Sequence, residues 1–220
     1  MKISLIVGVF IVCLLISSTA FAEQMIPGTR WKYMRLNSSG KPQCVMKVST
    51  KSMRENWLSA CSTGISNWNN YSDNKVSITI DNSGSANVEL LTYGANGHGW
   101  PYDQRVIAFT MPFDNSGRFY SSFVEGSCAI NEFGDRIRHT GVIFNPNFSN
   151  AAGRPNVQQN LAKVITHELG HCMNMGHPSS SSTQTVMKQG WSDSLTWSDF
   201  DRPQIYDYVV LTLLYDKIYS

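Results

Sequence analysis

A short segment in the second half of the chain has the residue types and spacing of a catalytic metal site. Residues 167 to 177 read HELGHCMNMGH, so His167 and His171 are four residues apart. On a helix this spacing puts two imidazoles on one face, one turn apart, where both can bind a single zinc ion. Glu168 follows the first histidine and can act on a water at the open position of the metal. The segment therefore predicts zinc chemistry on a helix.

A third histidine completes the predicted ligand set. His177 lies six residues after His171, too far along for the same face of a continuing helix. The helix must therefore end, and the chain must turn back. Asn174 and Gly176 suit such a turn, because Asn and Gly tolerate left-handed backbone conformations best. Three protein ligands with an open fourth position are the catalytic pattern of zinc sites, rather than the structural one.

Other third ligands are conceivable. A Glu on a later helix is excluded, because no Glu follows Glu168 in the sequence. An Asp is possible in principle, from Asp193, Asp199 or Asp201, but His177 has the better spacing. A coincidental HExxH on an ordinary helix is the remaining alternative, and the third histidine weighs against it.

The segment resembles the signature of the metzincin zinc peptidases, H-E-x-x-H-x-x-G-x-x-H followed by a Met-turn. Asn174 stands where the family usually has Gly. Met187, in a Thr-Val-Met segment ten residues after His177, resembles the methionine of the Met-turn. Gln189 stands where some metzincin groups have a tyrosine, so no role of that tyrosine is transferred. The resemblance is to the matrixin-like members, and it is strongest over residues 164–190.

The resemblance implies both a fold and an activity. The fold would be α+β and zincin-like, with a twisted mixed β-sheet, an active-site helix, a long backing helix and a small irregular C-terminal subdomain with a last helix. The activity would be that of a zinc-dependent metalloendopeptidase. One zinc ion held by His167, His171 and His177 would activate a water, Glu168 would act as general base and then acid, and Met187 would form a hydrophobic floor.

Hydrophobic periodicity predicts elements that agree with this layout. Strands are expected at residues 30–36, 44–49, 75–81, 88–93, 105–111 and 141–144, and helices at 52–68, 156–173 and about 201–209. The apolar face of the first helix is formed by residues at spacings of three and four, namely Trp57, Ala60, Cys61, Gly64, Ile65 and Trp68. By analogy, strand 105–111 would be the edge strand above the cleft, where an extended protein or peptide substrate could add as a further strand.

The N-terminus has the pattern of an export signal. Lys2 precedes an apolar run over residues 3–16, and an A-x-A pattern ends at Ala22. We expect a signal peptide at residues 1–22 and a secreted protein, either extracellular or periplasmic. An uncleaved membrane anchor is the alternative, although the run is short for a bilayer span.

The remaining residues, 23–220, are enough for a single catalytic domain. By analogy its upper part would comprise about 28–176 and its lower part about 177–220. The net charge is +2 with no basic run, which argues against a nucleic-acid partner. No later segment approaches membrane length. A monomer is expected.

The cysteines of the exported chain suggest two disulfides. The favoured pairs are Cys44 with Cys61 and Cys128 with Cys172. Alternatively, Cys44 in Lys-Pro-Gln-Cys-Val faintly resembles the cysteine switch of matrixins, in which a thiolate caps the zinc.

A second metal site has little support in the sequence. Asp81, Asn82 and Asp103 could bind Ca²⁺, but such residues more often form turns. His98 and His139 are interpreted as surface or loop residues.

Two other functions remain open. The chain could be a non-catalytic zinc-binding adhesin or toxin module on the same fold, or a processing enzyme of narrow specificity. A module without catalysis would have no chemical need for Glu168, so this residue favours an enzyme.

Overall fold

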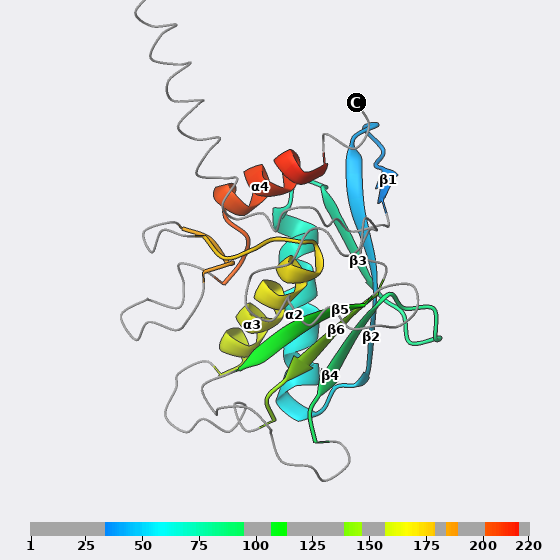
Figure 1. Cartoon of the computed structure of the whole chain (residues 1–220), viewed down its shortest axis with the longest axis vertical. Coiled ribbons are helices and arrows are strands. Elements are labelled where there is room, and N and C mark those ends of the chain that lie inside the picture. Colours follow the sequence, from blue (N-terminus) through cyan, green and yellow to red (C-terminus); the bar gives the residue numbers. More distant parts are fainter. Residues whose placement is uncertain are drawn as a thin grey trace, which may run out of the picture.

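The chain forms an α+β structure, as expected. The computed structural model describes residues 34–94, 107–113, 139–146, 157–178, 184–188 and 201–215. The elements in chain order (Figure 1) are β1 (Met34–Leu36), β2 (Pro42–Ser52), α2 (Glu55–Tyr71), β3 (Val76–Ile80), β4 (Val88–Thr92), β5 (Ala108–Phe113), β6 (His139–Phe144), α3 (Val157–Cys172) and α4 (Ile205–Tyr215). The predicted signal peptide lies outside the described residues.

The strands form one curled, mixed sheet. Its order is β1-β2-β4-β6-β5, and β3 pairs with the other side of β2. The β2–β3, β2–β4 and β4–β6 pairs are parallel, whereas β1–β2 and β5–β6 are antiparallel. Within the described residues, β5 pairs with β6 alone, so β5 is an edge strand, in agreement with the expectation for this segment.

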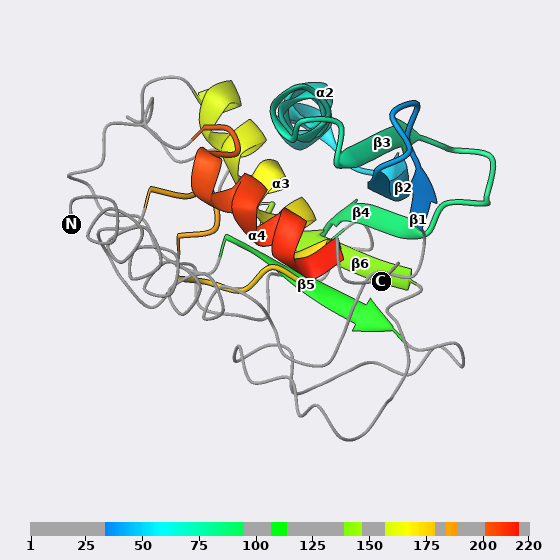
Figure 2. The same cartoon turned by 90° about the horizontal axis from the view of Figure 1, so that it is seen from above.

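Helices α2 and α3 lie side by side against one face of the sheet (Figure 2). The predicted apolar face of α2 is buried at each of its positions. Two of these residues, Trp57 and Trp68, also donate from Nε1 to the carbonyl oxygens of Asn145 and Thr166, at 3.0 and 2.7 Å. Buried indoles with satisfied N–H groups fix α2 to the end of β6 and to α3.

Some element boundaries differ from the expected ones. Helix α2 begins at Glu55 rather than at residue 52, and its N-cap, Arg54, makes no side-chain capping bond. Strand β2 has 11 residues because it pairs with β3 over its first half and with β4 over its second. Helix α4 continues to Tyr215, beyond the predicted end near residue 209.

The disulfide prediction is wrong for the cysteines that the structure describes. Cys44, Cys61 and Cys172 are all free and buried. Cys44 lies on β2 and Cys61 on α2, where both serve as small apolar residues of the core. Burial raises the pKa of Cys61 to about 12, and it also raises that of Cys44 despite a hydrogen bond with Tyr215. Cys128, the predicted partner of Cys172, lies outside the described residues.

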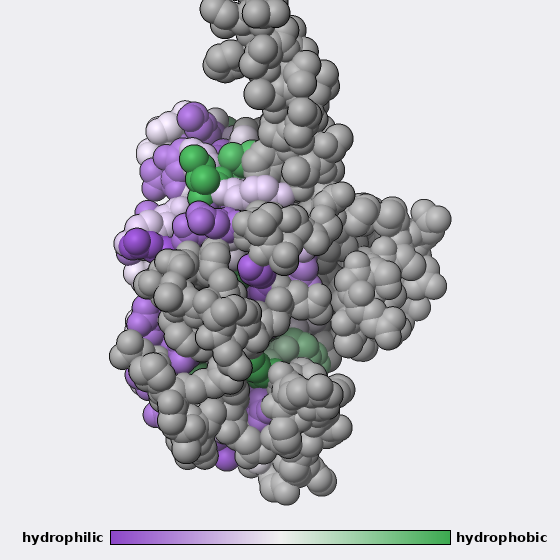
Figure 3. Space-filling view, turned by 90° about the vertical axis from the view of Figure 1, so that its left-hand side faces the viewer, coloured by the Kyte–Doolittle hydropathy of each residue, from purple (hydrophilic) through white to green (hydrophobic). Residues whose placement is uncertain are grey.

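None of the helices in the described ranges is both long enough and apolar enough to cross a bilayer. On the face drawn in Figure 3, the described residues are mostly hydrophilic, with small separate apolar areas. Large apolar side chains on the surface are scattered over several elements, for example Leu36, Leu58 and Ile205.

Candidate metal centre

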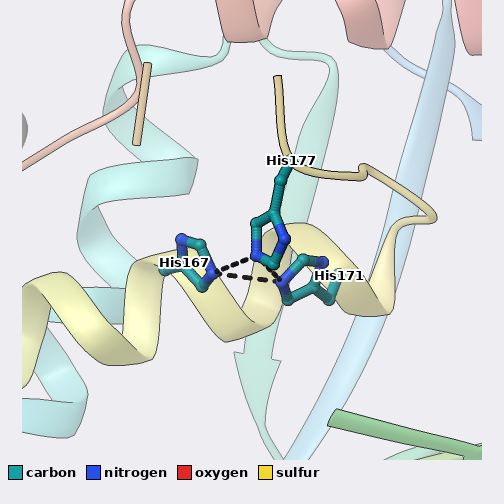
Figure 4. Close-up of side chains that lie close together, drawn as sticks. All are labelled: His167, His171 and His177. Atoms are coloured by element: carbon teal, nitrogen blue, oxygen red, sulfur yellow. Dashed lines mark hydrogen bonds between the residues drawn. The ribbon is translucent and has the colours of Figure 1, made fainter. Parts of the chain in front are cut away.

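Three histidine side chains converge on one point beside helix α3 (Figure 4). His167 and His171 project from the helix, and His177 reaches them from the segment that follows it. The Nε2 atom of His171 lies 3.0 Å from that of His167 and 3.1 Å from that of His177, and the third distance is 3.2 Å. Within the described residues, this is the one group of His, Cys, Asp or Glu side chains close enough to hold a metal ion.

The other ring nitrogens show which tautomer two of the histidines adopt. Nδ1 of His167 lies 2.8 Å from the carbonyl oxygen of Val186, and Nδ1 of His171 lies 2.7 Å from that of Met175. A carbonyl oxygen only accepts, so both Nδ1 atoms carry the proton and both Nε2 atoms present a lone pair. The close Nε2 atoms of His167 and His171 therefore repel each other unless a cation lies between them. Backbone carbonyls commonly orient metal-binding histidines in this way.

These distances and donors fit a zinc ion. Two nitrogens in a tetrahedral zinc site with bonds of 2.0–2.1 Å lie about 3.3 Å apart, close to the separations observed here. Burial, followed by the charge of neighbouring groups, lowers the pKa of His167 to about 3 and that of His171 well below its usual value. Burial also lowers the pKa of His177. The imidazoles are thus neutral at physiological pH, as metal binding requires.

The chain reverses direction after α3 as the sequence predicts. Asn174 has a φ of +68°, the left-handed conformation expected at this position. The Asn174 amide donates to the carbonyl of His171 and the Met175 amide to that of Gly170, the bond pair of a Schellman motif. Asn174 thus ends the helix as Gly would, and it brings His177 back to the cluster. Gly176 has no positive φ, so Asn174 alone provides the left-handed residue of this turn.

A short loop lies against the ligand helix and holds His167. In residues 184–188, Val186 accepts from His167 Nδ1 through its carbonyl, and its amide donates to Asp207 Oδ2 at 3.0 Å. Asp207 is fully buried near the start of α4, where it also accepts from the Thr185 hydroxyl and from the Gln204 amide. A chain of hydrogen bonds therefore runs from α4 through one residue, Val186, to a candidate metal ligand.

Met187 lies in this loop and packs against the ligand helix. Its side chain is fully buried. A Cβ placed on Gly170 would overlap Met187 Sδ and would lie 3.2 Å from Trp68 Cζ2. The absence of a side chain at Gly170 thus gives Met187 its place against the helix. The role of Met187 as a hydrophobic floor beneath a metal stays a prediction.

Glu168 follows His167 on α3, where it is buried and contacts strand β5. Its Oε2 accepts a 2.6 Å hydrogen bond from the hydroxyl of Thr110. Burial raises the pKa of Glu168 to about 7, and the Thr110 hydrogen bond partly opposes this shift. A carboxyl group with a pKa near neutrality can both accept and release a proton at physiological pH. The position therefore suits a general base or acid.

Several predicted alternatives are not part of this group. Asp201 instead accepts from Gln159 Nε2, at 3.2 Å, whereas Asp193 and Asp199 lie outside the described residues. Cys44 is buried in the core and is not among the possible metal ligands, so the cysteine-switch alternative is wrong.

Of the residues that could bind Ca²⁺, Asp81 and Asn82 lie in the loop between β3 and β4 and make local hydrogen bonds. Asp81 accepts hydrogen bonds from Ser83 and Ser85, and Asn82 accepts from the Thr50 amide. Asp103 and His98 lie outside the described residues. The backbone of His139 begins β6.

Sequence reasoning missed two residues of the site, Thr110 and Asp207. Thr110 lies in a predicted strand, and its distance of 58 positions from Glu168 gives no local signal. Asp207 carries a partial signal, since it is the one carboxylate within the otherwise apolar helix α4. A buried position for this charge could have been suspected from that pattern.

No protein-family model matches the sequence, and a search of curated proteins finds no match.

Proposed function

We propose that this protein is an exported zinc-dependent metalloendopeptidase of the metzincin type, acting as a monomer on extended protein or peptide substrates. The observation that carries the proposal is the convergence of three imidazoles, with Nε2 atoms 3.0–3.2 Å apart, on and after a helix that also carries the buried Glu168. Three histidines with a neighbouring carboxyl suit a catalytic zinc site better than a structural one. The resemblance of the sequence to metzincins and the mixed sheet with an edge strand beside α3 support it.

His167, His171 and His177 would hold the metal, which when bound supplies a Lewis acid that polarises a carbonyl and acidifies water. Glu168 would take a proton from the attacking water as the oxygen–carbon bond forms. It would pass that proton to the nitrogen as the carbon–nitrogen bond breaks, so that water is consumed and two peptides are released.

The substrate would lie along strand β5. Within the described residues, the side of β5 away from β6 has no strand partner. An extended peptide can hydrogen-bond to such an edge through its main chain, which allows cleavage of many sequences. The contact between Thr110 and Glu168 puts this strand next to the proposed base.

The test is cleavage of an unfolded protein by the exported, purified protein and its variants. Glu168→Gln should lower kcat by about 10²–10⁴-fold, because it removes general acid–base catalysis. Zinc content, measured by mass spectrometry of the metal, should not change. Glu89→Gln is a matched control, because it makes the same change at an exposed position on β4 and should leave kcat unchanged.

Two outcomes would contradict the proposal. If the wild type binds zinc but cleaves neither unfolded proteins nor a peptide library, a non-catalytic zinc-binding module is the better account. If Glu168→Gln is as active as the wild type, the residue is not the base. Loss of activity with a chelator and its return with zinc would tie catalysis to the metal.

A further inference from the structure

The hydroxyl of Thr110 lies against Glu168 where strand β5 meets helix α3. Thr110 Oγ1 is 2.6 Å from Glu168 Oε2 and 3.2 Å from the main-chain oxygen of the same residue. Both side chains are buried, with exposed fractions of 4% for Thr110 and 6% for Glu168. A buried hydrogen bond between a hydroxyl and a carboxylate is short and charge-assisted, and it is stronger than one between neutral groups.

Glu168 depends on this one contact. Within the part of the chain that the structure describes, Thr110 is the residue that donates to the carboxyl group, and no Lys or Arg forms an ion pair with it. Because Oε2 is engaged, Oε1 is the oxygen without a described protein donor. A buried glutamate held at one oxygen has its side-chain rotamer fixed, whereas one without a donor can turn among several rotamers.

We infer that Thr110 is a positioning residue for the proposed reaction: its hydroxyl holds Oε2 so that Oε1 exchanges the proton with water and with the leaving nitrogen. The inference rests on the proposed function. Correct placement of a reacting group to within about 1 Å is worth on the order of 10²-fold in rate. Loss of the Thr110 hydroxyl should therefore reduce turnover without changing the metal ligands.

The position of Thr110 on β5 gives the contact a second consequence. Thr110 pairs with Val142 in the antiparallel β5–β6 ladder, so its backbone is fixed by the sheet. Strand β5 is also the edge along which we propose that the substrate lies. One strand would thus fix both the peptide and the carboxyl that acts on it, and would set their relative positions.

The test compares two substitutions at position 110. Thr110→Val has nearly the same shape and the same β-branched preference for a strand, but it lacks the hydroxyl. Thr110→Ser keeps the hydroxyl and loses a methyl group. Thr92→Val is the matched control, because Thr92 is another buried threonine of the same sheet, whose hydroxyl accepts from the Arg54 amide, at 3.2 Å.

We expect Thr110→Val to lower kcat by about 10–100-fold, the range for loss of a hydrogen bond to a charged group, with KM little changed. Thr110→Ser should restore kcat to within about fivefold of the wild type, and Thr92→Val should leave it unchanged. Zinc affinity should be the same in all variants. In the Glu168→Gln background, Thr110→Val should have no further effect, since the two residues act as a unit.

A second measurement tests the contact without catalysis. The infrared carboxylate band of Glu168 is the difference at alkaline pH between a protein and the same protein with Glu168→Gln. This band should move in Thr110→Val and stay in place in Thr110→Ser. The inference is overturned if Thr110→Val keeps kcat within about threefold of the wild type, or if Thr110→Ser is as impaired as Thr110→Val in a folded, zinc-loaded protein. A wild type without activity would instead refute the proposed function, and an unmoved band would refute the contact.

Discussion

Asp207 is a buried carboxylate that accepts hydrogen bonds from two backbone amides. It accepts from the amides of Val186 and Gln204 and from the Thr185 hydroxyl. The bond to Gln204, the residue before α4, is one half of a capping box. The positive end of the helix dipole also favours a negative charge here. The local backbone therefore stabilises a charge that also fixes the loop behind His167.

Removal of this carboxylate should weaken metal binding from a distance. Asp207→Ala leaves the Val186 and Gln204 amides without their acceptor, which should destabilise the fold by about 2–4 kcal/mol. It should also weaken zinc affinity by about 10–100-fold, the usual effect of losing a group that orients a metal ligand. Chemical denaturation and competition with a zinc-binding dye would measure the two effects. Asp207→Asn, which keeps one acceptor oxygen, should be intermediate.

The control for this prediction is Asp201→Asn. The Asp201 carboxylate contacts Gln159 and lies near Arg202 rather than the loop at 184–188. Equal zinc affinity in wild type and Asp207→Ala would show that Val186 keeps His167 in place without Asp207.

The residues of the site that could be predicted are those with a local signal. His167, His171 and His177 lie within eleven positions, and helix geometry together with a turn at Asn174 suffices to bring them together. Thr110 could not be predicted in this way. It contacts the same site from a distant strand, and only the tertiary fold determines such a contact.

At the scale of elements, hydrophobic periodicity predicts which face of a helix or strand is buried better than it predicts where that element ends. The face of α2 is buried as predicted because its apolar residues repeat at helical spacing and have α3 as a partner. In β3, Val76 and Ile78 are buried, but Ile80, although in phase with them, is 51% exposed. The alternation of apolar residues therefore does not show where the layer that covers a strand stops. The length of β2 likewise depends on two partner strands, whose positions the local sequence does not encode.

The contact between α2 and α3 depends on the absence of a side chain at Gly64. A Cβ at this position would lie 2.7 Å from Ile165 Cγ2 and 3.0 Å from the Ala162 carbonyl oxygen. Gly64→Ala gains helix propensity, but this overpacking should outweigh the gain and destabilise the protein by about 1–3 kcal/mol. The melting temperature should fall by about 5 °C for a chain of this size.

Thermal unfolding followed by circular dichroism would measure this change. Ser62→Ala, at an exposed neighbouring position of α2, should leave the melting temperature unchanged or slightly higher. A Gly64→Ala variant as stable as the wild type would show that α2 and α3 can move apart without loss of stability.

At the scale of the whole molecule, metal binding should be coupled to folding. The ligands come from α3 and from the segment after it, and hydrogen bonds connect one of them through Val186 to α4. An unfolded chain cannot hold these three nitrogens together, so a metal ion would bind the folded state preferentially. A ligand present at about 1,000 times its dissociation constant then stabilises the fold by about 4 kcal/mol.

Removal of zinc with a chelator should therefore lower the melting temperature by about 10 °C. Addition of excess zinc should restore it. His177→Ala should melt at the temperature of the zinc-free wild type, and added zinc should change this temperature little. His139→Ala should respond to zinc as the wild type does. A melting temperature that does not depend on zinc would mean that the cluster binds the ion too weakly to matter for stability.

The free thiols in the core have a consequence for how the protein is made. The folded chain protects Cys44, Cys61 and Cys172 from oxidants, because they are buried and the raised pKa of the first two keeps those thiols protonated. The newly made chain has no such protection. If it is exported into an oxidising compartment, collapse of the core must be faster than mispairing of these cysteines. The yield of active protein should then depend on folding speed, and refolding from denaturant should succeed only with a reductant present.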